Sequence, residues 1–171
     1  MKHLALLFLT VVAMFGIIST AYAVHGVVPA ETPAVMPGPD AKALGDFITK
    51  TNPYTQWNMW PGKQAFYKGT EPHGALLTTY VNDVAYNSIR GKKGMADGSI
   101  IVKENYTPDK QLAAVTVMYR IKGYHPAGGD WFWAKYRPDG SVEASGKLEG
   151  CIKCHGQRAA NDYIMTEDVM K

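Results

Sequence analysis

The chain has 171 residues, and its 18 lysines and arginines against 15 aspartates and glutamates give a formal net charge of +3. This balance is too weakly basic for a protein that binds phosphate backbones, so we expect no nucleic-acid partner. Only two cysteines are present, and a disulfide between them would close a very short loop and contribute little to stability.

The N-terminal segment has the pattern of a secretory signal peptide. Lys2 supplies the positive charge, residues 4–18 form an apolar run, and residues 21–23 (Ala-Tyr-Ala) form a small-residue cleavage site. The alternative is a membrane anchor, but the apolar run is shorter than the roughly 20 residues that span a bilayer. We expect residues 1–23 to be removed after Ala23 and the mature protein to be periplasmic.

Residues 24–39 contain four prolines and little apolar periodicity, which predicts an extended leader. A helix is predicted over residues 41–50, with Asp40 as its N-cap and with Leu44, Phe47 and Ile48 on one apolar face. A second helix is predicted over residues 83–90, capped by Asn82 and closed by Gly91. The other predicted elements are strands over 75–81, 99–106, 112–121, 131–137 and 142–144, and a helix over 150–160. We therefore expect residues 40–171 to form a single α+β domain, a mainly antiparallel β-sheet with a few helices.

The last predicted helix carries the C-x-x-C-H pattern of Cys151, Cys154 and His155, which is the attachment signature of c-type haem. Two thiols add across the vinyl groups of the haem, and the adjacent histidine binds the iron. A structural zinc site is the alternative, but it needs four ligands, and the chain has no second cysteine pair. We expect one haem c, held covalently by both cysteines, with His155 as its proximal metal ligand and the other ring nitrogen bonded to a carbonyl or carboxylate.

The motif lies unusually late, with only sixteen residues after His155. Ordinary small cytochromes c carry it early, with a methionine ligand far downstream, and this chain has no room for that layout. The helix-bundle cytochromes also carry it late, but the four long amphipathic helices of a bundle are missing here. The rest of the haem pocket must therefore come from the upstream sheet.

The sixth position of the iron has several candidate ligands. His73 and His125 are histidines in predicted loops, although such residues are more often turn or surface residues. Three methionines could also bind the iron, although methionine more often serves as packing: Met95, Met118 and Met165. Since none is convincing, we expect a five-coordinate iron, whose open position suits a gas or a substrate.

Lys103 is unusual because it lies in the predicted strand 99–106, where an apolar side chain would be ordinary. A strand lysine usually points to solvent or extends toward it. A lysine facing the haem would instead be desolvated, which lowers its pKa and leaves a free amine for chemistry.

Three segments occur together in an order that resembles a known family. They are D-G-S-I-I-V-K-E-N at 97–105, G-D-W-F-W-A-K-Y at 129–136, and the haem motif followed by Asp162-Tyr163. Over residues 40–168 the chain resembles the cytochrome P-460 family, which includes the beta-sheet cytochromes c-prime. The resemblance implies an antiparallel β fold, a homodimer and a five-coordinate haem c.

The resemblance also implies a role for Lys103. Catalytic members of the family oxidise hydroxylamine and nitric oxide species, and they carry a lysine cross-linked to the haem edge; Lys103 matches that lysine. Their distal carboxylate and arginine have no counterparts here, because the matching positions hold Thr116 or Met118 and Leu77. Without that proton acceptor, hydroxylamine oxidation loses support and binding of a small neutral gas gains it.

Three functions remain open from the sequence. The first is an oxidoreductase that acts on hydroxylamine or nitric oxide and passes electrons to a partner cytochrome. The second is a non-catalytic protein that binds or senses nitric oxide. The third, a simple electron carrier, requires a strong sixth ligand. We expect a periplasmic mono-haem cytochrome that binds or oxidises small nitrogen species, and whether it is an enzyme stays open.

Overall fold

The computed structural model describes residues 35–171. The predicted signal peptide at 1–23 and most of the predicted leader at 24–39 lie outside this range. Within it, no helix has the length and apolar character needed to cross a membrane.

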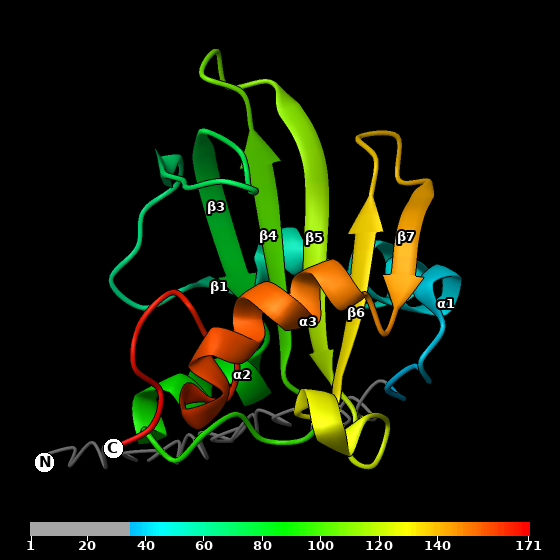
Figure 1. Ribbon diagram of the computed structural model, residues 1–171. Helices are drawn as coiled ribbons and strands as arrows, with labels where there is room; N and C mark the ends of the chain where they lie inside the picture. The colour runs from blue at the N-terminus through cyan, green and yellow to red at the C-terminus, as the bar shows by residue number, and fades with distance from the viewer. Residues whose placement is uncertain (1–34) are drawn as a thin grey trace, which may run out of the picture. The chain divides into compact units, whose positions relative to one another are not determined.

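The described chain is built on one antiparallel sheet of seven strands (Figure 1). The strands are β1 Asn58–Met59, β2 Tyr67–Lys68, β3 Leu76–Val81, β4 Ile100–Tyr106, β5 Leu112–Arg120, β6 Trp131–Tyr136 and β7 Val142–Gly146. Their order is β1-β3-β4-β5-β6-β7, and β2 also pairs with β3. The helices are α1 Ala41–Asp46, α2 Asp83–Gly91 and α3 Glu149–His155. The predicted α+β fold with a mainly antiparallel sheet is confirmed.

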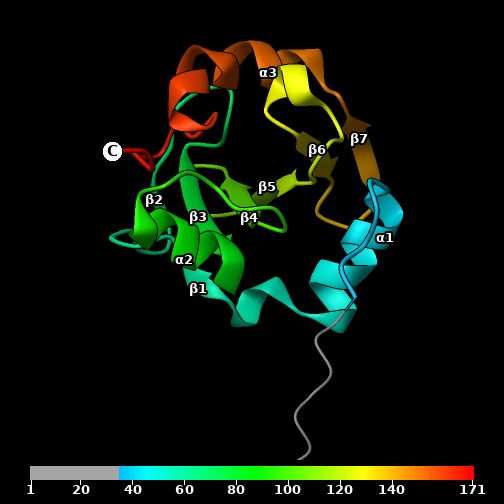
Figure 2. The same cartoon turned by 90° about the horizontal axis from the view of Figure 1, so that it is seen from below.

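The sheet has a separate apolar core on each face because its strands alternate. On β4, Ile100 and Val102 point to one face and pack with α1, while Ile101 points to the other face and packs with Trp131 and Trp133 of β6. Figure 2 shows α1 on one side of the sheet and α3 on the opposite side. The strand pattern therefore assigns each β4 and β6 side chain to a defined layer.

The first helix begins at Asp40, as predicted, where the carboxylate accepts a hydrogen bond of 2.7 Å from the Ala43 N–H. The α-helix ends earlier than predicted, at Asp46, and the chain continues as a wider π-helical turn, Phe47–Thr51. The predicted apolar face is nevertheless buried: Leu44, Phe47 and Ile48. The helical segment stops before Pro53, because a residue that precedes proline avoids helical geometry.

Asn82 caps α2 as expected and also ties the helix to the sheet. Its side-chain oxygen accepts from the N–H groups of Ala85 and Ile100, both at 3.0 Å, and its amide donates to Gly98. The helix ends one residue later than predicted, because Lys92, with φ of 53°, takes the left-handed conformation expected of Gly91.

Four short irregular turns complete the described chain: the π turn η1 Phe47–Thr51 and the 3₁₀ turns η2 Tyr54–Gln56, η3 Pro126–Gly128 and η4 Gly156–Asn161. The helix predicted over 150–160 is thus α3 followed by η4. The two-residue strands β1 and β2 were not predicted, because a pair of residues is too short to show an alternating pattern.

Candidate haem-binding site

Helix α3 crosses the face of the sheet formed by β4, β5 and β6 (Figure 1). Residues three and four apart share a helix face, so Cys151, Cys154 and His155 all point to the same side. These three residues line a cavity of about 420 Å³ between helix and sheet. The opposite wall includes Leu77, Ile101, Lys103, Thr116, Met118 and Trp133. The fold thus brings the C-terminal motif against the upstream strands.

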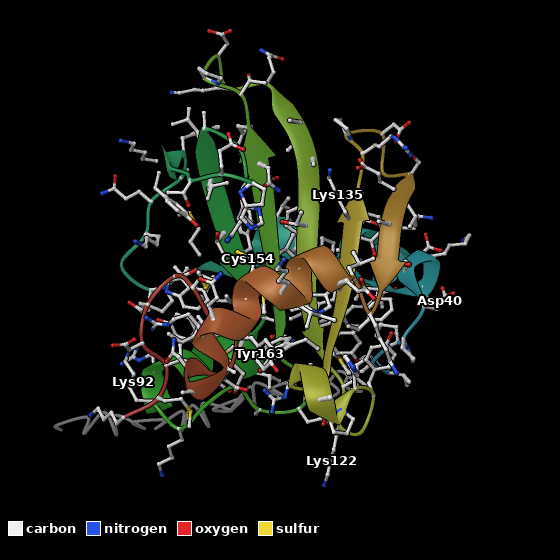
Figure 3. All side chains as sticks on the ribbon, viewed as in Figure 1. Asp40, Lys92, Lys122, Lys135, Cys154 and Tyr163 are labelled. Atoms are coloured by element: carbon white, nitrogen blue, oxygen red, sulfur yellow. The ribbon has the colours of Figure 1, made fainter. Side chains whose placement is uncertain are left out.

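The two cysteines are free thiols that are both partly buried. Burial raises the pKa of the Cys151 thiol. Figure 3 shows Cys154 on α3, beside the strands of the sheet. Both thiols therefore line one cavity, as attachment of a single haem requires.

His155 is buried, with 8% of its surface exposed, and its orientation is fixed by the backbone. Its Nδ1 lies 2.8 Å from the carbonyl oxygen of Tyr163. A carbonyl only accepts, so Nδ1 carries the proton and Nε2 keeps its lone pair. Burial lowers the pKa of His155, which favours this neutral form. The predicted bond from the histidine to a carbonyl is confirmed, and Nε2 is left available for a metal.

The carbonyl of Tyr163 is itself held in place by Asp162. Both residues adopt left-handed backbone conformations, with φ of 57° and 67°. The Asp162 carboxylate forms an ion pair with Arg120 and accepts a hydrogen bond from the Met95 N–H at 2.6 Å, and its carbonyl accepts from the Trp131 indole at 3.1 Å. The sequence singled out this Asp-Tyr pair by resemblance alone, and the structure gives it a positioning role.

Lys103 lines the cavity from β4 and does not point to bulk solvent. It is partly buried, and burial lowers the pKa of its amine from 10.5 to about 8. Cross-strand pairing places it opposite Thr79 on β3 and Thr116 on β5. A substantial fraction of a lysine with this pKa is neutral near pH 8 and can act as a nucleophile.

Replacing Lys103 by methionine is expected to stabilise the haem-free protein at pH 7. The folded state binds the lysine proton less tightly than the unfolded state, so the cost of burying the charge is fully present below about pH 8. This cost, of the order of 3 kcal/mol, disappears as the pH rises from about 8 to 10.5. Denaturant unfolding at pH 7, 9 and 10.5 should show the advantage of the variant shrinking.

The matched control is Lys122→Met, because Lys122 is exposed (Figure 3). This change should alter the free energy of unfolding by less than about 0.5 kcal/mol at every pH. If the Lys103→Met variant is less stable than the wild type at pH 7, the interpretation of Lys103 as a buried amine without a charged partner is contradicted.

The distal positions named by the resemblance lie in the cavity wall. Leu77, Thr116 and Met118 all line it, and none carries a carboxylate or a guanidinium. Glu71, an exposed residue of the loop between β2 and β3, also lines the cavity. The sequence did not single out Glu71, because a glutamate in a loop carries no signal of its own.

The structure separates the candidate sixth ligands into two groups. His73, Met118 and Met165 line the cavity, whereas His125 and Met95 do not. The His73 ring lies 6.3 Å from the His155 ring between centroids. Burial and the neighbouring charge of Lys103 lower the pKa of His73 to about 4, so its ring is neutral at pH 7.

The residues around this cavity fit a haem c. Two thiols and a neutral imidazole with a free Nε2 lie on the α3 side, and largely apolar side chains form the wall on the sheet side. Four lysines also line the cavity and can face the carboxylates that a haem carries: Lys63, Lys68, Lys103 and Lys135.

Residues 35–171 contain no group of three or more His, Cys, Asp or Glu side chains arranged to hold a metal ion.

A family model described as Cytochrome P460 matches residues 52–166, a range that includes all seven strands, His73, Lys103 and the C-x-x-C-H motif. No curated protein matches the chain.

Proposed function

The chain belongs to the cytochrome P460 family, and from this premise we propose that it is a periplasmic mono-haem c-type cytochrome that binds small nitrogen compounds, above all nitric oxide. The family binds haem c and acts on nitrogen species, and the site fits that cofactor. The observation that carries the proposal is the distal wall, where Leu77 and either Thr116 or Met118 hold the positions that the resemblance matches to the arginine and the carboxylate of catalytic members. A neutral diatomic gas needs no proton acceptor there.

The chain's own residues would divide the work as follows. Cys151 and Cys154 would hold the haem by two thioether bonds, and His155 would bind the iron through Nε2, oriented by the Tyr163 carbonyl. The bound haem supplies an iron atom that binds nitrogen ligands and exchanges single electrons. We propose that the form that takes up the ligand is five-coordinate, with His155 as its only protein ligand.

Oxidation of hydroxylamine is the second candidate, and the position of Lys103 favours it. A buried amine with a lowered pKa lies in the cavity, where the resemblance implies a covalent link to the haem edge. A partner cytochrome would accept the electrons. Glu71 also lines the cavity and could accept protons from a substrate.

Two assays on the purified haem-loaded protein separate these candidates. We expect the ferrous protein to bind one nitric oxide molecule per chain, and we expect turnover of hydroxylamine with an electron acceptor no faster than that of free haem. The apolar wall is the reason for both results. Turnover well above free haem, lost in Lys103→Met, would contradict gas binding as the function and support oxidation.

The intact mass of the same protein adds an independent measurement. For the gas-binding protein we expect the mature chain from Val24 plus one haem, with Lys103 unmodified. A bond from Lys103 to the haem would lower this mass by two hydrogen atoms. Export, removal of residues 1–23 and a homodimer are part of the proposal, and the mass together with the sedimentation of the native protein tests them.

A further inference from the structure

Two imidazoles face the same cavity, one from α3 and one from the loop between β2 and β3. We propose that His73 is the second axial ligand of the resting haem iron, opposite His155, and that an incoming nitrogen compound must displace it. This inference rests on the proposed function, because it concerns the iron position at which the nitrogen compound binds.

The first argument is the proton position on His73. The Asn105 side-chain nitrogen donates to three acceptors at 2.9–3.1 Å: the carbonyls of Lys103 and Ala114 and the Thr116 hydroxyl. These bonds fix the amide so that its oxygen faces His73, 2.9 Å from Nδ1. Since that oxygen only accepts, His73 Nδ1 carries the proton and Nε2 keeps its lone pair.

The second argument is that His73 and His155 are prepared in the same way. Each ring donates Nδ1–H to an oxygen fixed by the fold, and this is the usual support of a metal-bound histidine. On His155 the same arrangement belongs to the haem motif. The hydrogen bond from His73 to Asn105 would give a second metal-bound imidazole the same support.

The third argument is the distance between the rings. Their centroids are 6.3 Å apart and their planes are perpendicular. An imidazole nitrogen binds a first-row metal at about 2 Å, with the ring centre roughly 1 Å beyond, so two imidazoles on one metal have centroids about 6 Å apart. A ligand hydrogen-bonded between the metal and a distal base would lengthen this to roughly 9 Å. The observed separation fits direct ligation.

The two ligands differ in how they are held, and this decides which one leaves. His155 belongs to α3 and is tied to the motif cysteines, which thioether bonds would fix further. His73 lies in the segment between β2 and β3, beside the exposed residues Glu71 and Pro72, with a turn hydrogen bond of 3.0 Å from its own N–H to the Thr70 carbonyl. Movement of this segment can release His73 without disturbing the sheet.

The absorption and electron paramagnetic resonance spectra of the full haem-loaded protein test this inference. We expect a low-spin six-coordinate iron in the wild type and a high-spin five-coordinate iron in His73→Ala. Added imidazole should restore the low-spin spectrum of the variant by filling the vacated position, and a merely structural role for His73 would instead leave the wild type itself high-spin. His125→Ala is the matched control, since His125 does not line the cavity, and its spectrum should stay that of the wild type. Circular dichroism checks that each variant is folded.

Nitric oxide binding gives a kinetic readout. The wild-type rate should reach a plateau as the concentration of nitric oxide rises, because loss of His73 becomes limiting, and His73→Ala should bind at least tenfold faster without a plateau. A high-spin wild type, or a low-spin His73→Ala, would overturn the inference while leaving gas binding intact. The proposed function would instead be overturned if the wild type is low-spin and His73→Ala is high-spin, but neither protein binds nitric oxide.

Discussion

Replacing both Cys151 and Cys154 by alanine is expected to abolish covalent haem attachment almost completely. The two are the only cysteines of the chain, and both point from α3 into the same cavity. Thioether bonds need thiols, and no other side chain can form them. Haem staining after denaturing electrophoresis should fall to background, and the intact mass should be that of the chain alone.

The single variants and a neighbouring residue provide the controls. Cys151→Ala or Cys154→Ala should each keep a haem on one thioether, with a shifted absorption band, because one bond is enough to survive denaturation. Lys153→Ala, an exposed position on the same helix, should retain full haem content. Haem that resists denaturation in the double variant, and still does so when Lys103 is also replaced by methionine, would contradict attachment at these cysteines.

Replacing Asp162 by alanine should lower the free energy of unfolding by about 3 kcal/mol. The carboxylate is only 16% exposed, and its loss leaves the Arg120 guanidinium and the Met95 N–H without their partner. Alanine also disfavours the left-handed φ of 57° at this position. The Tyr163 carbonyl would then lose its fixed position, and the ligation of His155 should weaken. Denaturant unfolding and the absorption spectrum of the haem-loaded protein measure the two effects.

Two other variants identify the cause. Asp162→Asn keeps an oxygen acceptor and tolerates the left-handed conformation, so it should lose less stability than the alanine variant. Asp168→Ala removes the exposed ion pair with Arg158 and should cost less than about 1 kcal/mol. Equal losses in Asp162→Ala and Asp168→Ala would contradict a positioning role for Asp162.

The elements that the sequence predicted well are those with a strong local signal. β4, β5 and β6 are long runs of β-branched and aromatic residues, and both capped helices begin at the predicted side chains, Asp40 and Asn82. The elements that the sequence did not predict have a weak local signal. β1 and β2 are two residues each and exist because β3 offers them hydrogen-bonding partners.

The residues of the candidate site also differ in how well the sequence predicts them. The spacing of Cys151, Cys154 and His155 alone predicts haem attachment, because the three residues are neighbours on one helix turn whatever surrounds them. Lys103 left two orientations open, since strand alternation gives it a face but not the identity of that face. His73 was one of five equivalent candidates, because nothing local distinguishes a ligand from a turn residue.

By itself the sequence determined the antiparallel fold, the haem motif and the family of this protein, since each depends on residues close together in the chain or on their order. Only the tertiary structure decided what lies opposite His155. Asn105 lies 32 residues from His73, and His155 lies 82 residues away. Their meeting depends on strand register and on the placement of α3 across the sheet, and these follow from packing between distant segments.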